Sequence, residues 1–159
     1  MKIWPANSFD IHTALSPEKV FEALEINVEP KKLFWINREH KYFQGTFSKE
    51  GFKLTRIIHY RNSFLPRISG SIAPEGAGSV VKIKMNLHPL VIAFMAVWFG
   101  GVIIASVAVI IAFITHSSRA NPGMLVPLGM LIFGIALVSG GFWFEAPKQQ
   151  EKLIAILQG

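Results

Sequence analysis

The chain has 159 residues and a net charge of +6, and 51% of its residues are hydrophobic. Its mean hydropathy is +0.40. This composition suits a small membrane protein with one folded extramembrane domain. Cysteine is absent, which excludes disulfides and metal sites built from thiolates.

The first predicted elements are a strand and a helix. Residues 8–15 alternate between apolar and polar side chains, which predicts a strand. A helix begins after Ser16, a natural N-cap, with Pro17 in the first helical position. It ends within residues 27–30. The apolar residues 33–36 lie between basic residues, and they fit either a short strand or loop or an amphipathic segment that touches the bilayer.

Period-two patterns predict four further strands, separated by short polar turns. Their ranges are 42–48, 52–60, 67–73 and 79–87. In the last of them, Val81, Ile83 and Met85 point to one face. Lys82 and Lys84 point to the other, which is typical of a sheet with one buried and one wetted face. Because the strands follow one another with short turns, we predict an antiparallel β-meander.

Two uncharged apolar runs follow, at residues 90–114 and 124–144. Neither contains Asp, Glu, Lys, Arg or His. Each reaches the roughly 20 residues that a helix needs to cross about 30 Å of hydrocarbon. The polar segment between them allows only a tight reversal. We therefore predict a transmembrane helical hairpin over residues 89–144, with spans at about 90–115 and 122–144.

The tail, residues 145–159, has a helical pattern over 147–157. An amphipathic helix needs a surface to cover. We expect the tail to pack on the open face of the sheet and to complete the domain formed by residues 1–88. The predicted fold is an α+β membrane protein. It consists of an antiparallel β-meander with an N-terminal helix, a transmembrane hairpin and a C-terminal helix that packs back on the sheet.

The distribution of charge predicts the topology and a lipid contact. Residues 1–86 hold 13 Lys and Arg against 8 Asp and Glu, whereas the predicted turn holds Arg119 alone. The positive-inside rule then places the domain and both termini in the cytoplasm. Anionic headgroups would attract the basic residues near the membrane, or these residues only orient the protein and solvate its surface. The candidate headgroup contacts are Arg61, Arg67, Lys82 and Lys84.

Small residues recur at four-residue spacing in both apolar runs, a pattern that lets helix backbones approach closely. The candidate helix-packing residues are Ala96, Gly100, Gly101, Ala105, Ala108, Ala112, Gly134, Ala136 and Gly140. Either the two spans pack only on each other, or the spare small faces bind a membrane-protein partner or a second copy of the chain.

The sequence contains no motif for catalysis, cofactor binding or metal binding. The five histidines do not pair with each other or with Glu at metal-ligand spacing. Ser63 lacks the surroundings of a nucleophile elbow. We therefore assign no catalytic, cofactor or metal residue. Basic and aromatic side chains around residues 42–47 could mimic a stacking surface, but membrane attachment argues against nucleic acid as a partner.

The sequence Arg-Asn-Ser-Phe-Leu-Pro at residues 61–66 is followed by Gly70, and Leu-His-Pro at residues 87–89 precedes the first apolar run. Over most of its length the chain resembles a group of small uncharacterised bacterial two-span membrane proteins with this signature. The resemblance implies a bacterial membrane, hence the inner membrane, and no site residues. The order of elements is also similar to helix-grip and pleckstrin-homology-like domains. The hairpin interrupts that order, so no ligand cavity is carried over.

These observations lead to three hypotheses. The first is a non-enzymatic inner-membrane protein that acts as an accessory or scaffold subunit of a membrane complex. The second is a module that binds or senses anionic lipid. The third is an enzyme that acts on a membrane-bound substrate.

Overall fold

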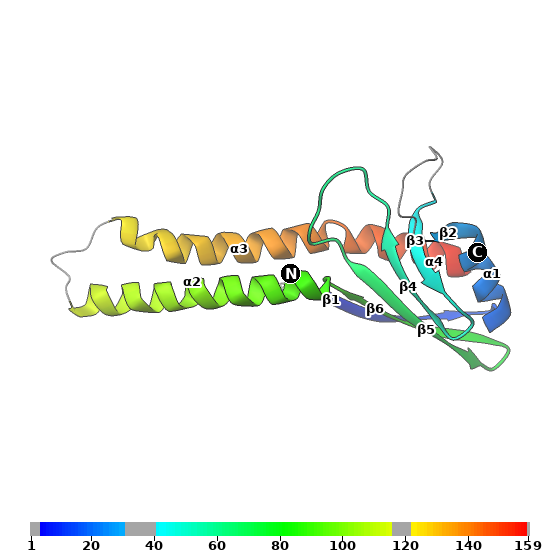
Figure 1. Cartoon of the computed structure of the whole chain (residues 1–159). Coiled ribbons are helices and arrows are strands. Elements are labelled where there is room, and N and C mark those ends of the chain that lie inside the picture. Colours follow the sequence, from blue (N-terminus) through cyan, green and yellow to red (C-terminus); the bar gives the residue numbers. More distant parts are fainter. Residues whose placement is uncertain (1–3, 31–40, 116–121, 159) are drawn as a thin grey trace.

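The computed structural model describes residues 4–30, 41–115 and 122–158, and Figure 1 shows a sheet at one end of a long helical hairpin. The strands are β1 (Ala6–Thr13), β2 (Val28–Pro30), β3 (Phe43–Phe47), β4 (Gly51–Arg56), β5 (Arg67–Glu75) and β6 (Gly78–Asn86). The helices are α1 (Pro17–Asn27), α2 (Pro89–Thr115), α3 (Val126–Trp143) and α4 (Ala146–Gln158), with a short 3-10 turn η2 (Pro122–Leu125). Two predictions concern residues outside the described ranges: the strand, loop or amphipathic segment at residues 33–36, and the turn that contains Arg119.

The six-stranded sheet has the order β1-β6-β5-β4-β3-β2 and is mixed. Strands β3 to β6 form the predicted meander, and β1 pairs antiparallel with β6. The prediction of a purely antiparallel meander is wrong at the other edge, where β2 runs parallel to β3. The connection between this pair is residues 31–42, which reaches the dozen residues that a parallel connection requires. Strand β2 is too short to show alternation, and it ends at Pro30, a residue tolerated at a sheet edge.

Helix α1 forms where the sequence predicts it. The Ser16 side chain caps the helix by accepting a hydrogen bond from the Lys19 N–H at 3.5 Å, and Pro17 lies in the first turn. Val20 and Leu24 are buried in the core beneath the sheet. The helix thus carries the chain across one face of the sheet, from β1 at one edge to β2 at the other.

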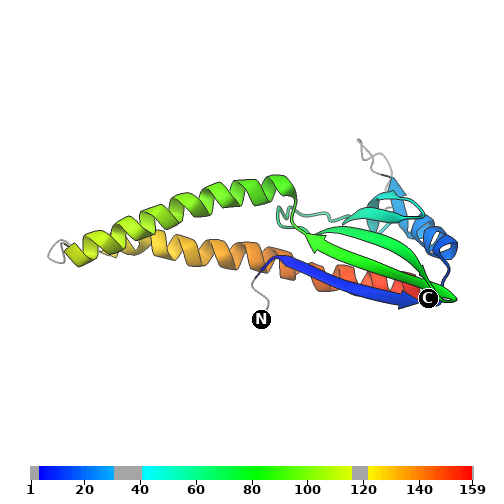
Figure 2. The same ribbon diagram turned by 90° about the horizontal axis from the view of Figure 1, so that it is seen from below.

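Helices α3 and α4 form a nearly continuous rod that runs from the hairpin onto the sheet (Figures 1 and 2). At the turn between them, the Phe144 N–H still donates to the Gly140 carbonyl at 2.9 Å. Further along, Leu153 and Leu157 of α4 are fully buried. The Thr13 hydroxyl at the end of β1 donates to the Leu157 carbonyl at 2.6 Å. The prediction that a C-terminal helix packs back on the sheet is therefore confirmed.

Helix α2 and the rod of α3 and α4 are long and apolar enough to cross a membrane. Helix α2 has 27 residues, which corresponds to about 40 Å. Only 11% of its most apolar stretch is buried, so most of the apolar side chains of this helix are not covered by the rest of the chain. Val102 and Ser106 of α2 and Gly134 and Val138 of α3 are buried between the two helices.

The core lies between the sheet and helices α1 and α4. On β6, Val81, Ile83 and Met85 are buried while Lys82 and Lys84 are exposed, as the alternation predicts. Among the described residues, no helix covers the opposite side of the sheet (Figure 2). We call this uncovered side the outer face.

Candidate functional site

Four cations lie on the outer face, and the strand register orders them in rows. In the first row Arg67 of β5 lies opposite Asn86 of β6. In the second row Lys53 of β4 and Lys84 of β6 lie on either side of β5, and both are opposite Ser69. In the third row Lys82 lies one step further along β6. The cations therefore form a graded series along the strands.

The first row lies nearest the hairpin, because Asn86 ends β6 and α2 begins at Pro89. Residues in a strand rise by about 3.3 Å each, so successive rows on one face lie about 7 Å apart. At physiological salt, charges interact over about 8 Å. A charged surface at the start of the hairpin would therefore act mainly on Arg67, then on Lys53 and Lys84, and least on Lys82.

Three of the four predicted headgroup residues, Arg67, Lys82 and Lys84, lie together on the outer face. Arg61 is exposed in the loop between β4 and β5, outside the strands that form these rows. Sequence reasoning missed Lys53, although the alternation in β4 places it on the polar face. Four dispersed positions in the sequence thus become one surface only after the strands pair.

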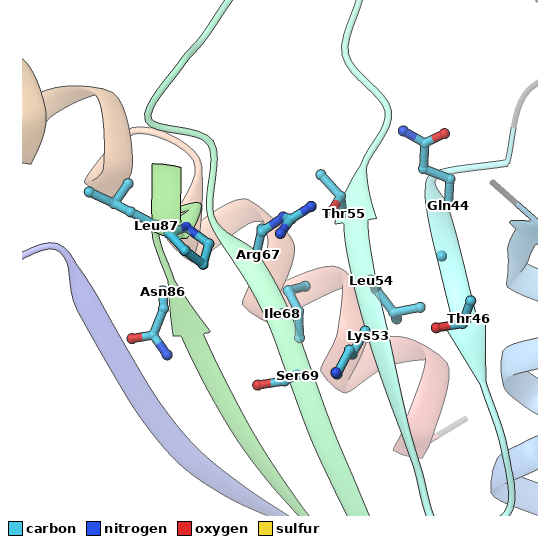
Figure 3. Close-up of a pocket in the computed structure, with 12 residues that line it drawn as sticks. Gln44, Thr46, Lys53, Leu54, Thr55, Arg67, Ile68, Ser69, Asn86 and Leu87 are labelled. Carbon is cyan, nitrogen blue, oxygen red and sulfur yellow. The ribbon is translucent and has the colours of Figure 1, made fainter. Parts of the chain in front are cut away.

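A hollow of about 340 Å³ opens over the first two rows of the outer face (Figure 3). We call it the sheet hollow. Arg67 extends from β5 toward Thr55 on β4, and Lys53 lies one row further on. The polar lining consists of Gln44, Thr46, Lys53, Thr55, Arg67, Ser69 and Asn86, with no carboxylate among the described lining residues. Two cations surrounded by neutral hydrogen-bonding groups suit an anion such as a phosphate.

The acidic residues of the outer face lie away from the sheet hollow. Asp10 of β1 faces Lys82 in the third row. The carboxylate of Glu75, at the far end of β5, lies 2.6 Å from the His12 Nδ1, within hydrogen-bond distance. The end of the sheet next to the hairpin is therefore cationic, and the negative charge lies toward the far end.

A second polar cluster lies on the inner side of the sheet, at the turn between α3 and α4. The fully buried Glu145 accepts hydrogen bonds from the Arg56 guanidinium at 2.5 Å and from the Tyr60 hydroxyl. Lys148, one turn further on, lies 3.3 Å from the same carboxylate. The Arg56 guanidinium also stacks over the Tyr42 ring at 4.7 Å. These contacts join α4 to β4 and the following loop, and we call them the Glu145 clamp.

The protonation states of the Glu145 clamp indicate a structural role. Burial alone would raise the pKa of Glu145. The hydrogen bond from Tyr60, the charge of Arg56 and the hydrogen bonds from Lys148 and Arg56 outweigh burial and hold that pKa below its ordinary value of 4.5. Burial and the neighbouring carboxylate raise the pKa of Tyr60. At neutral pH the carboxylate is ionised and the phenol keeps its proton, so the clamp is a fixed ion pair rather than an acid–base pair.

Gln149 follows the clamp by one turn of α4 and is fully buried. Neither its amide nitrogen nor its amide oxygen has a hydrogen-bond partner among the described residues. A buried amide without partners costs stability. Sequence reasoning missed both Gln149 and the clamp.

The loop between β4 and β5 holds the Arg-Asn-Ser-Phe-Leu-Pro sequence, and it packs against the end of α3. Strand β4 ends at Arg56, so the predicted strand 52–60 is too long. The Asn62 side chain donates to the Gly141 carbonyl at 2.9 Å and accepts from the Phe64 N–H at 2.9 Å. A Cβ at Gly141 would lie 2.9 Å from the Phe64 ring. The motif therefore fastens the sheet to the second helix of the hairpin.

Few of the small residues of the hairpin lie in the contact between α2 and α3. Gly134 is buried there, and a Cβ at this position would collide with the Trp98 ring. Around Gly100, Gly101 and Gly140, an added Cβ would meet nothing within 4 Å. The alanines of the set that are exposed are Ala96, Ala105, Ala108 and Ala136. Most of the predicted packing residues are thus exposed instead of being buried against the partner helix.

Among the described residues, no group of three or more His, Asp or Glu side chains lies close enough to hold a metal ion. Comparisons with protein-family models, with curated proteins and with solved structures find no match.

Proposed function

We propose that this chain is a two-span protein of the bacterial inner membrane whose cytoplasmic domain binds anionic lipid headgroups. The observation that carries the proposal is the position of the sheet hollow. It holds Arg67 and Lys53, contains no described carboxylate, and reaches Pro89, where α2 begins. If α2 and α3 cross the bilayer, this end of the sheet lies at the level of the headgroups.

The proposed orientation follows from the charges and the aromatic residues at the junction. The domain side carries the outer-face cations, and the positive-inside rule favours the cytoplasm for it. Trp4 and Phe144 are exposed beside the start of the hairpin, and the Trp143 indole donates to the Trp4 carbonyl at 3.2 Å. The amphipathic ring of tryptophan favours the interface between membrane and water.

The Glu145 clamp and the β4–β5 loop support the same proposal, because they restrict the orientation of the sheet. Glu145 attaches the sheet to the rod formed by α3 and α4, and Asn62 attaches the loop to Gly141. Two anchors on one helix hold the sheet hollow at a constant height above the predicted span. A flexible linker would not maintain that position.

The test is thermal unfolding of the purified chain in mixed micelles, as phosphatidylglycerol replaces phosphatidylcholine. A ligand that binds only the folded state stabilises it in proportion to its occupancy. We expect phosphatidylglycerol to raise the Tm of the wild type. The triple variant Arg67→Gln, Lys53→Gln, Lys84→Gln should lose most of this rise, since each cation near an anionic surface contributes about 1 kcal/mol.

The matched control replaces three exposed lysines outside the outer-face rows, Lys19, Lys49 and Lys152, with glutamine. It removes the same net charge and should keep the rise in Tm. If the outer-face variant kept the full rise, or if both variants lost it equally, binding at the sheet hollow would be wrong.

A second candidate function is that of an accessory subunit of a membrane complex. The open space around Gly100, Gly101 and Gly140 favours it, because a further helix could approach closely there. Replacing these three glycines with leucine should release any bound membrane protein or second copy. An unchanged mass of the extracted particle would count against this candidate.

A further inference from the structure

An apolar groove of about 400 Å³ lies between α2 and α3 where the two helices reach the sheet. We call it the span groove. Met95, Ala96 and Phe99 form its α2 wall, and Val138 lies on the α3 wall. Its size is within the range of sites that hold small molecules, about 300–1,000 Å³.

The lining of the span groove decides what can fill it. Apart from Asn86 and Ser139, its described side chains are apolar. A dry apolar cavity does not hold water well, because water needs two or more polar partners. Both walls belong to the helices proposed as membrane spans, so the groove opens toward lipid. A hydrocarbon chain matches this lining.

The span groove and the sheet hollow meet at the junction of β6 and α2. Asn86 and Leu87 line both of them. Arg67 lies opposite Asn86 on the neighbouring strand, and paired strands lie about 4.8 Å apart. A cationic site for a phosphate therefore lies next to the mouth of an apolar site for a chain. That juxtaposition matches one amphipathic molecule.

We propose that the chain binds one phospholipid as a ligand, with an acyl chain in the span groove and its anionic headgroup at Arg67 and Asn86. This inference rests on the proposed function and goes beyond it. General attraction to a charged surface needs only the outer-face cations, whereas a bound lipid also needs the groove. Arg67 can meet a phosphate with two parallel hydrogen bonds. The net negative charge of the headgroup, which zwitterionic phosphatidylcholine lacks, gives the preference for an anionic lipid.

The groove arm of the test is native mass spectrometry of the full chain released from nanodiscs of equal parts phosphatidylglycerol and phosphatidylcholine. The wild type should retain one phosphatidylglycerol. Ala96→Trp fills the groove and should lose the retained lipid. Ala105→Trp is the matched control, because this exposed alanine lies nine residues further along α2, on the opposite side of the helix. It should retain the lipid as the wild type does.

The headgroup arm uses Arg67→Gln, which leaves the groove intact and decides the inference if Ala96→Trp fails to fold. It should still retain one lipid, but the preference for phosphatidylglycerol should fall by about fivefold. Equal lipid retention by Ala96→Trp and Ala105→Trp, or an unchanged preference in Arg67→Gln, would overturn the inference.

These failures are distinguishable from failure of the proposed function. The rise in Tm with phosphatidylglycerol would persist in the wild type if only the inference were wrong. The rise would be absent, or it would not be lost selectively in the triple outer-face variant, if the proposed function were wrong.

Discussion

Replacement of Glu145 by glutamine tests whether the Glu145 clamp fixes the sheet to the hairpin. The variant keeps the shape of the side chain but removes its charge, leaving Arg56 without its anion. Removing one partner of a buried ion pair costs about 3–5 kcal/mol. Because 22% of the Arg56 side chain is exposed, water offsets part of this cost and we expect about 3 kcal/mol. For a chain of this size that corresponds to a fall in Tm of about 6–12 °C.

The assay is thermal unfolding followed by tryptophan fluorescence in one detergent. Glu151→Gln, which removes an exposed carboxylate from the same helix, serves as the control and should change the Tm by less than about 2 °C. The double variant Glu145→Leu, Arg56→Met removes both charges, so it should be more stable than Glu145→Gln alone. Equal Tm values for Glu145→Gln and Glu151→Gln would show that the Glu145 clamp does not stabilise the fold.

The same variant gives a pH dependence with a defined sign. The pKa of Glu145 in the folded chain lies below its ordinary value of 4.5. The charge therefore contributes its full stability above about pH 4.5, and this contribution is lost as the pH falls toward the folded pKa. The difference in Tm between the wild type and Glu145→Gln should be constant near neutral pH and should shrink below pH 4.5. A difference that grew on acidification would contradict the assigned ionisation.

Three further changes test the packing. Gly134→Val should lower the Tm by overpacking the contact between α2 and α3, at a cost of about 1–3 kcal/mol, whereas Gly129→Val, where an added Cβ meets nothing within 4 Å, should leave the Tm unchanged. Gly141→Val should displace Phe64 and speed tryptic cleavage in the β4–β5 loop, and an unchanged cleavage rate would count against its docking on α3. Gln149→Met removes a buried amide that has no described partner and should raise stability by about 1 kcal/mol. A fall in Tm of Gln149→Met would show that the amide is hydrogen-bonded.

Local patterns predicted much of this fold because they report which side of an element is buried. The alternation of Val81 and Ile83 with lysines predicted β6, and the uncharged runs predicted the two long helices. Strand β2 was not predicted, because three residues are too few to show periodicity. Its pairing with β3 depends on residues that are not adjacent to it in the sequence. The predicted strand 52–60 was too long because Ile57 and the residues after it retain a strand-like pattern although they lie in a loop.

The candidate site was predictable in part for the same reason. Arg67 and Lys84 were recognisable as exposed cations near the hairpin, and the alternation in β4 already contained the signal for Lys53. The Glu145 clamp was not predictable, because its partners Arg56 and Tyr60 lie 89 and 85 residues away in the sequence. Small residues at four-residue spacing indicate that close approach is possible, but they do not indicate which faces meet. Among them, Gly134 is buried in the contact between α2 and α3.

Native mass spectrometry of the chain extracted from its own membrane into nanodiscs, without added lipid, would show directly whether the protein binds anionic phospholipid. We expect a particle that contains this chain with bound anionic phospholipid, and loss of that lipid from the variant with Arg67, Lys53 and Lys84 replaced by glutamine. A particle that holds a second protein in fixed proportion and no retained anionic lipid would contradict it and favour an accessory subunit.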